Sequence, residues 1–232
     1  MLDKIRNDVR VLMGNDDNGH GFEHVERVFK IAVKIAEEKR ANVEIVALAA
    51  LLHDADDYKF VGAENAAKLA NARRIMTENH VEENKMSQVC EIILTMGYSK
   101  FLQGIRPQTL EGQIVSDADM LDALGAVSVV RTVMYTVTHG SRKLFDRNMF
   151  PENNLTKEKY TAKGRDRDSA VNHFFDKLLK LKYILFTPEA RREADIRHRF
   201  MVDFLREFFR EQDCFDWIDY LEEYEKKEQK TA

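Results

Sequence analysis

The sequence has few residues that interrupt helices. Its 232 residues include only 10 glycines and 3 prolines. Both residue types destabilise helix interiors, so their scarcity permits long helices. Apolar side chains recur at helical spacing, and no sustained alternation of apolar and polar residues indicates a sheet. With a hydrophobic fraction of 44% available for a core, we predict an all-α fold.

Cysteines, long apolar runs and clustered charge are also lacking. Cys90 and Cys214 are the only cysteines and form no CxxC pair, which is typical of a reduced, cytoplasmic protein without disulfides. Residues 1–13 carry charges throughout and lack the apolar centre of a signal peptide. No run approaches the ~20 apolar residues that span a bilayer. The net charge of −4 is dispersed, so neither a membrane nor a nucleic acid duplex is an expected partner.

Periodicity predicts a series of helices. We expect them at residues 2–13, 22–39, 43–53, 63–80, 81–96, 113–137, 170–185 and 188–212. Residues 98–112 look like a loop, and residues 140–169 form a longer irregular one. We expect a single domain over 1–212, followed by a charged C-terminal helix or tail over 213–232.

Histidines and acids gather at three places beside apolar segments. The first cluster is GHGFEHVERV with His24, the second is HDADDYK with His53 and Asp54, and the third is SDADMLDALGA with Asp119. The second follows six apolar residues, and burying charge there is costly unless it binds something. Imidazole and carboxylate suit a divalent metal. Two nitrogens and two oxygens from these four residues would leave two positions of an octahedral site for water and substrate.

Each cluster also has a simpler interpretation. His53 could end a helix as a cation, which the helix dipole favours. Ser116-x-x-Asp119 before an apolar run matches a capping box, in which neither residue binds metal. Asp56 and Asp117 are more typical of exposed acids than of ligands.

The order His, His-Asp, Asp resembles the HD-domain metal-dependent phosphohydrolase superfamily. It is carried by His24, His53-Asp54 and Asp119, and the flanking HVERV, AALLHDADDYKF, DADMLDALGA and NHFFDKLLKLK are similar to small bacterial HD proteins. The resemblance covers roughly residues 10–212. It implies a multi-helix bundle around one divalent ion held by those four residues. Mn²⁺ or Mg²⁺ is favoured for activity, with Fe²⁺, Ni²⁺ or Zn²⁺ as alternatives.

Two further residues of the second cluster are candidate catalytic groups. Asp57 lies four residues after His53, which predicts the same helical face. In related HD hydrolases an acid at this position has a catalytic part, so the resemblance favours Asp57 as the group that orients or deprotonates a water. An ion pair with a nearby lysine is the alternative. Lys59 lies two residues after Asp57 and is a second candidate.

Phosphate substrates need cations beyond the metal. Six residues are candidates for substrate binding: His20, Arg27, Asp122, His173, Lys177 and Lys180. Arg131 is a weaker one. In the alternative interpretation, His20 is a simple turn residue, and Lys177 and Lys180 form a solvated helix face.

The loop over 140–169 is basic, which favours a lid over a phosphate site. A surface insertion is the alternative. Phe145, Phe150 and Tyr160 could stack on a base, although loop aromatics more often attach a loop to the core.

We predict a metal-dependent phosphohydrolase acting on a small phosphorylated molecule, a nucleotide or deoxynucleotide, as pyrophosphohydrolase or phosphatase. A phosphodiesterase for cyclic or signalling nucleotides is one alternative. Only His80 lies between Asp54 and Asp119, whereas HD phosphodiesterases with several metals carry more histidines there. The other alternative is a non-catalytic regulatory module that binds metal or nucleotide. A monomer and a homodimer are equally compatible with the sequence.

Overall fold

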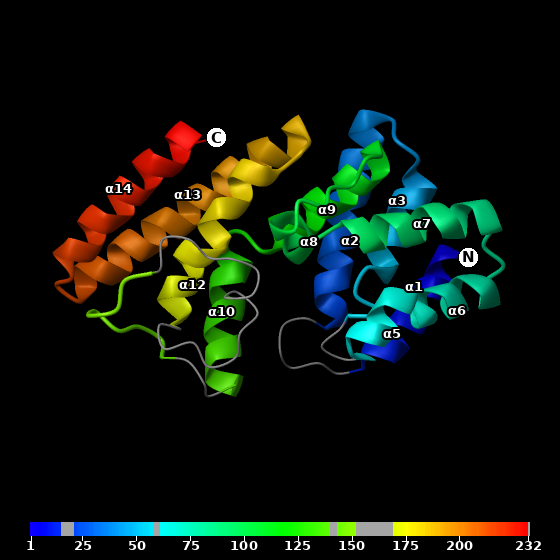
Figure 1. Ribbon diagram of the computed structural model, residues 1–232, viewed down its shortest axis with the longest axis horizontal. Coiled ribbons are helices and arrows are strands. Elements are labelled where there is room, and N and C mark those ends of the chain that lie inside the picture. Colours follow the sequence, from blue (N-terminus) through cyan, green and yellow to red (C-terminus); the bar gives the residue numbers. More distant parts are fainter. Residues whose placement is uncertain (15–20, 58–60, 140–142, 152–168, 232) are drawn as a thin grey trace. The chain divides into compact units, whose positions relative to one another are not determined.

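The described part of the chain is helical. The computed structural model describes residues 1–14, 21–57, 61–139, 143–151 and 169–231, and in these ranges the isolated bridge between Lys143 and Ser169 is the only β pairing (Figure 1). The predicted all-α fold is confirmed. Contacts divide the chain into two compact units, Met1–Met120 and Leu121–Ala232. The single domain expected over 1–212 stays a prediction.

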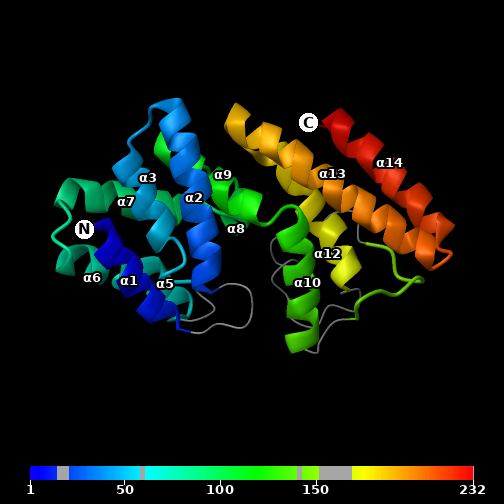
Figure 2. The ribbon, with the colours of Figure 1, turned by 180° about the vertical axis from the view of Figure 1, so that it is seen from behind.

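The first unit is built around a short apolar helix. Its helices are α1 (Leu2–Met13), α2 (Phe22–Lys39), α3 (Val43–Leu52), α5 (Ala63–Lys68), α6 (Ala70–Glu78), α7 (Glu83–Thr95), α8 (Tyr98–Leu102) and α9 (Leu110–Asp122), of which α9 continues two residues past the unit's end. Helix α3 packs on α1, α2 and α7, and Figure 2 shows α2 alongside it. All residues from Ile45 to Leu52 are buried. A helix that is apolar all round belongs in a core, so α3 forms the centre of this unit.

Local sequence determines where α3 begins. The Asn42 side chain accepts a hydrogen bond from the Ile45 N–H at 3.2 Å, an N-cap that satisfies one of the free amides of the first turn. The Asn42 N–H donates to Glu111 Oε1 at 3.0 Å, which joins the start of α3 to α9. Helix α3, which precedes the second polar cluster, is therefore tied to α9, which contains Asp119 of the third cluster.

The second unit consists mainly of α10 (Ala126–His139), α12 (Ala170–Asp176), the 3₁₀ helix η1 (Leu178–Ile184), α13 (Pro188–Glu211) and α14 (Phe215–Thr231). Helix α13 begins at Thr187, whose hydroxyl accepts a hydrogen bond from Ala190 N at 3.3 Å, and Pro188 suits the first helical position. It packs on α10, η1 and α14.

An aromatic cluster holds α14 to the rest of the second unit. Trp217 is fully buried, and its ring stacks on Phe150 at 4.4 Å between centroids and meets Phe145 edge-on at 5.0 Å. Its Nε1–H donates to the Arg147 carbonyl at 2.9 Å. Phe145 and Phe150 therefore attach residues 143–151 to α14, which is the alternative that the sequence left open for these aromatics. Tyr160 lies outside the described residues.

Two predicted helices are interrupted in the structure. The predicted helix over 113–137 is divided, because α9 ends at Asp122 and α10 starts at Ala126. Gly125 between them has φ 84°, a left-handed conformation that glycine adopts without strain. The predicted helix over 63–80 is divided at Leu69, which has φ 51°.

Two other boundaries also differ from the prediction. Residues 98–112 contain α8 and the beginning of α9, which starts early because the Thr109 hydroxyl accepts a hydrogen bond from Gly112 N at 3.1 Å. The predicted helix over 170–185 is an α-helix only to Asp176 and then continues as a 3₁₀ helix. The predicted C-terminal helix over 213–232 is present as α14, and it buries Trp217 and Leu221.

Among the described residues, no single helix is both long and apolar enough to cross a bilayer. Only α9 and α10 taken together have that length and composition, and the chain breaks and bends between them.

Tyr183 makes the second unit sensitive to alkaline pH. Burial, followed by the negative charges of Glu225, Glu228 and Asp195, raises the pKa of Tyr183 to about 12. Its hydroxyl is buried and has no hydrogen-bond partner among the described residues. Because the folded pKa is raised, its contribution to stability is complete below about pH 10, the unfolded pKa, and is lost as pH rises towards 12.

We therefore expect Tyr183→Phe to lose less stability than the wild type between pH 10 and 12. Melting temperatures followed by circular dichroism would measure the difference, and the comparison at pH 8 is the internal control. Equal losses for both proteins across this range would contradict the prediction.

Candidate metal centre

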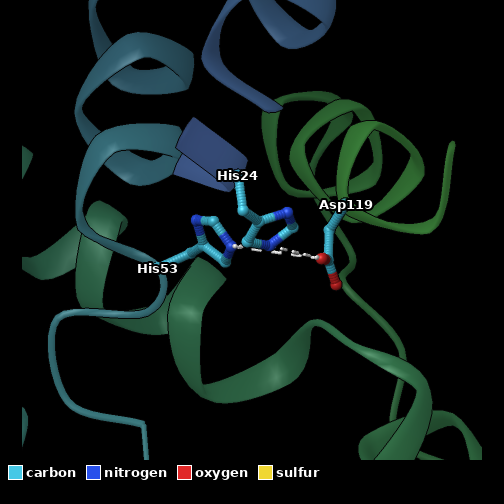
Figure 3. A group of neighbouring side chains, drawn as sticks. All are labelled: His24, His53 and Asp119. Atoms are coloured by element: carbon cyan, nitrogen blue, oxygen red, sulfur yellow. Dashed lines mark hydrogen bonds and ion pairs between the residues drawn. The ribbon is translucent and has the colours of Figure 1, made fainter. Parts of the chain in front are cut away.

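Three side chains from separate helical segments of the first unit converge. His24 lies in the first turn of α2, His53 follows the last residue of α3, and Asp119 lies on α9. Figure 3 shows the two imidazoles and the carboxylate directed toward one another. One ligand atom from each lies within 4.8 Å of the others. The sequence separates these residues by 95 positions, and only the packing of α2, α3 and α9 brings them together.

The distances between these atoms suit a shared ion. His24 Nε2 lies 3.2 Å from His53 Nε2 and 3.5 Å from Asp119 Oδ1, and His53 Nε2 lies 4.0 Å from that oxygen. Metal–ligand bonds of about 2.1 Å place neighbouring ligand atoms about 3.0 Å apart at right angles and about 3.4 Å apart at tetrahedral angles. The spacings of 3.2 and 3.5 Å are close to these values, and the third is longer at 4.0 Å. The residues present therefore fit a divalent ion held by His24 together with His53 and Asp119.

Asp54 adds a second carboxylate to this group. Its Oδ2 lies 3.5 Å from His24 Nε2 and 3.6 Å from His53 Nε2. Asp54 does not belong to the tightest group, which consists of His24, His53 and Asp119. The four side chains nevertheless offer the two nitrogens and two oxygens that the sequence predicted.

A hydrogen bond determines which nitrogen of His53 faces the centre. Its Nδ1 lies 2.9 Å from the carbonyl oxygen of Ala50, which can only accept a hydrogen bond. Nδ1 therefore carries the proton, and in the neutral ring Nε2 presents its lone pair toward His24 and Asp119. The position of His53 after α3 thus directs Nε2 toward His24 and Asp119.

The nitrogens are buried and the oxygens are partly accessible. The side chains of His24 and His53 are 4% and 3% exposed, whereas those of Asp54 and Asp119 are 19% and 27% exposed. The rings meet edge to face with centroids 5.1 Å apart. Buried imidazoles behind accessible carboxylates form a site that is closed on the nitrogen side and open to a ligand on the oxygen side.

The alternative of a capping box at Ser116 and Asp119 is wrong. Helix α9 begins at Leu110 with Thr109 as its cap, so both residues lie in the helix interior. A side chain there meets no free backbone amide of a first turn. Ser116 and the neighbouring Asp117 are buried, which also corrects the expectation that Asp117 is an exposed acid.

The argument that placed Asp57 on a helical face with His53 is wrong. Helix α3 ends at Leu52, and residues 53–56 form a turn in which Asp57 N donates to the Asp54 carbonyl at 3.2 Å. Asp57 is half-buried and close in sequence to the ligands. Its catalytic role stays a prediction that now depends on the turn.

The other candidates of the first unit are only partly described. Arg27 is half-buried on α2, three residues after His24 and so on the same side of the helix. His20 and Lys59 lie outside the described residues. The roles of all three residues stay predictions.

The remaining candidates belong to the second unit. Asp122 is buried, and its Oδ2 accepts a hydrogen bond from Arg131 Nη1 at 2.8 Å. His173 lies on α12, whereas Lys177 ends that helix and Lys180 lies on η1. Lys177 and Lys180 therefore do not lie on one continuous α-helix, because the helix changes type after Asp176. All four substrate-binding roles stay predictions.

The structural role of Asp56 was not predicted from the sequence. We expected an exposed acid, but the residue is 5% exposed and its carboxylate accepts backbone hydrogen bonds from Asn71 and Ala72. No local pattern links these positions, which are 15 and 16 residues apart.

Comparison with known proteins places this site in a family. A model of the HD domain matches residues 21–124. The uncharacterized protein YpgQ of Bacillus subtilis is 32% identical over 206 residues, which cover 88% of this chain and 90% of the relative. The chain therefore belongs to the HD-domain phosphohydrolase family, and the resemblance recognised in the sequence is confirmed.

Solved structures agree with this assignment. A crystal structure of YpgQ in complex with ADP has a TM-score of 0.69 at 29% identity and covers 91% of this chain and 97% of that one. An HD-superfamily hydrolase from Bacillus thuringiensis has a TM-score of 0.69 at 33% identity, with 91% and 96% covered. A protein from Lactobacillus plantarum has a TM-score of 0.78 at 30% identity, with 91% and 96% covered.

Proposed function

We propose that the protein is a metal-dependent phosphohydrolase of nucleotides or deoxynucleotides, with His24, His53, Asp54 and Asp119 as its metal ligands. The observation that carries the proposal is the convergence of two imidazole nitrogens and a carboxylate oxygen within 4.8 Å, beside a second carboxylate. A divalent ion in such a site would polarise a phosphate oxygen and lower the pKa of a bound water. Mn²⁺ or Mg²⁺ suits a site in which half of the ligands are carboxylates.

The protein's own residues supply the remaining chemistry. The Ala50 carbonyl keeps the His53 proton on Nδ1, which leaves the lone pair of Nε2 available to the metal. Asp57 orients or deprotonates the attacking water, with Lys59 as a second catalytic group. His20 and Arg27, together with Asp122, His173, Lys177 and Lys180, bind the substrate, and their cationic members offset its phosphate charge. Arg131 holds the buried Asp122 carboxylate in place.

The nucleotide substrate is supported by a relative. YpgQ, whose sequence is similar over most of this chain, has been crystallised with ADP. A nucleoside diphosphate in that protein is compatible with cleavage of a terminal phosphate or of the bond that releases pyrophosphate. We therefore leave the position of cleavage to the experiment.

We would measure product release from nucleoside and deoxynucleoside triphosphates, monophosphates and cyclic nucleotides in the presence of Mn²⁺. Asp54→Ala is the test variant. Asp3→Ala, which removes a carboxylate with 99% exposure from the same unit, is the matched control. We expect turnover of a triphosphate by the wild type and the control, and loss of that turnover in Asp54→Ala.

Each outcome distinguishes between functions. Pyrophosphate as the product would identify a pyrophosphohydrolase, and inorganic phosphate would identify a phosphatase. Turnover of a cyclic nucleotide alone would favour the phosphodiesterase. Mn²⁺ binding without turnover of any nucleotide would favour the regulatory module, and full activity in Asp54→Ala would refute the proposed centre.

A further inference from the structure

A buried acid lies within the turn that carries two of the proposed ligands. We call residues 53–57 the ligand turn. Asp56 in this turn is 5% exposed, and both of its carboxylate oxygens accept backbone hydrogen bonds. Oδ1 accepts from Asn71 N at 2.9 Å, and Oδ2 accepts from Ala72 N at 2.8 Å. The carboxylate of Asp56 thus binds backbone amides in the first turn of α6.

Helix α6 needs this acid because its own sequence provides no cap. Leu69 precedes the helix in a left-handed conformation, with φ 51°, and no side-chain cap is formed there. The first amides of a helix lack partners within the helix and attract negative charge. Asp56 satisfies two of these amides from a distance of 15 residues in the sequence, in place of a local N-cap.

A return hydrogen bond makes the connection reciprocal. Asn71 Nδ2 donates to the carbonyl of Ala55 at 3.1 Å, so three hydrogen bonds join the ligand turn to α6. Helix α6 is itself anchored in the core, because Ala72, Ile75 and Met76 are fully buried.

Among the described residues, the other backbone hydrogen bonds of the ligand turn are short-range. Ala55 N donates to the Leu52 carbonyl at 3.1 Å, Asp57 N donates to the Asp54 carbonyl at 3.2 Å, and Val61 N donates to the Asp57 carbonyl at 3.1 Å. These short-range bonds maintain the turn but do not attach it to the rest of the unit. Metal ligands must be held near their productive geometry by partners outside the coordination sphere.

We propose that Asp56 and Asn71 act as a clamp that positions His53 and Asp54 for metal binding. The inference rests on the proposed function, because it assumes the metal centre. Asp56 and Asn71 touch neither metal nor substrate, and they act only through the ligand turn. The clamp predicts that metal affinity depends on a hydrogen bond made by a neutral side chain of α6.

The first test is the affinity of Asp56→Asn for Mn²⁺, measured by isothermal titration calorimetry on the full chain. An amide accepts one of the two backbone hydrogen bonds but turns its NH₂ group toward the other amide. We expect Mn²⁺ affinity to fall about 10- to 100-fold, the range found when the partners of metal ligands are changed. Circular dichroism would establish that the variant is folded.

The second test is Asn71→Ala, which leaves the charge unchanged. Asp56→Asn also removes a negative charge near the ligands, and that alone would weaken cation binding. Asn71→Ala removes only the bond to the Ala55 carbonyl, and we expect Mn²⁺ affinity to fall severalfold. Asp8→Ala is the control, because Asp8 accepts a hydrogen bond from Asn79 at the other end of α6 at 2.8 Å. It should lower the melting temperature without changing Mn²⁺ affinity.

The results separate positioning from simple capping of α6. Lower Mn²⁺ affinity in both clamp variants, with the control unchanged, would support the clamp. Wild-type affinity in both, with a melting temperature lowered as in Asp8→Ala, would overturn it. If Asp56→Asn did not fold, Asn71→Ala would decide by the same criterion. Absence of Mn²⁺ binding by the wild type would overturn the metal centre, and the clamp with it.

Discussion

His53→Gln is expected to reduce turnover by at least about a thousandfold, which corresponds to roughly 4 kcal/mol of transition-state stabilisation. Glutamine has a similar length but no nitrogen lone pair to offer. The variant would therefore lose the nitrogen that lies 3.2 Å from His24 Nε2. It can still donate a hydrogen bond toward the Ala50 carbonyl, so the end of α3 should stay folded.

Metal binding gives a measurement that does not depend on the substrate. A ligand that binds only the folded state stabilises it by about 2.7 kcal/mol at a concentration of 100 times its Kd. We expect Mn²⁺ to raise the melting temperature of the wild type and not that of His53→Gln. His80→Asn, at an exposed histidine of the same unit, is the control and should respond like the wild type. An equal Mn²⁺ response in His53→Gln would exclude His53 as a ligand.

Trp217→Ala is expected to destabilise the second unit by about 3–5 kcal/mol, the usual cost of removing a large buried aromatic side chain. The indole is fully buried, contacts the rings of Phe145, Phe150 and Phe209, and donates to the Arg147 carbonyl. Its removal leaves a cavity and takes a hydrogen bond from that carbonyl. Since native domains are stable by only about 5–15 kcal/mol, this loss is large.

Urea denaturation followed by far-ultraviolet circular dichroism would measure the effect, because the variant lacks the only tryptophan of the chain. Phe215→Ala is the matched control, as Phe215 lies on the same helix and is 60% exposed. Trp217→Phe should fall between the two, since it retains much of the buried area but loses the donor. If Trp217→Ala were as stable as Phe215→Ala, the cluster would not hold α14.

The candidate ligands could be predicted because their order and flanking residues form a pattern that family membership confirms. The roles of residues that depend on a partner far away in the sequence could not be predicted. Asp56 looks like an ordinary exposed acid until α6 provides the two amides that its carboxylate binds. Nothing in the local sequence around Asp122 indicates the buried ion pair that it forms with Arg131.

The helix boundaries were predicted where a local signal was recognised and missed where it was not. Helix α3 starts at Val43 as predicted, with Asn42 as its cap. The hydroxyl of Thr109 starts α9 within a stretch that the sequence presented as a loop, and Gly125 was passed over inside an apolar run. Leu69 in a left-handed conformation had no signal at all, because leucine rarely adopts it and the surrounding packing must enforce it.

The sequence by itself determined that this protein is helical and that its three polar clusters belong to an HD-type pattern. Both properties follow from short-range information: helical periodicity, few helix-breaking residues and the order of His and Asp. Only the tertiary structure decided that His24, His53 and Asp119 converge and that Asp56 is bound by α6. Those facts depend on contacts between residues far apart in the chain, and such contacts form only when the helices pack.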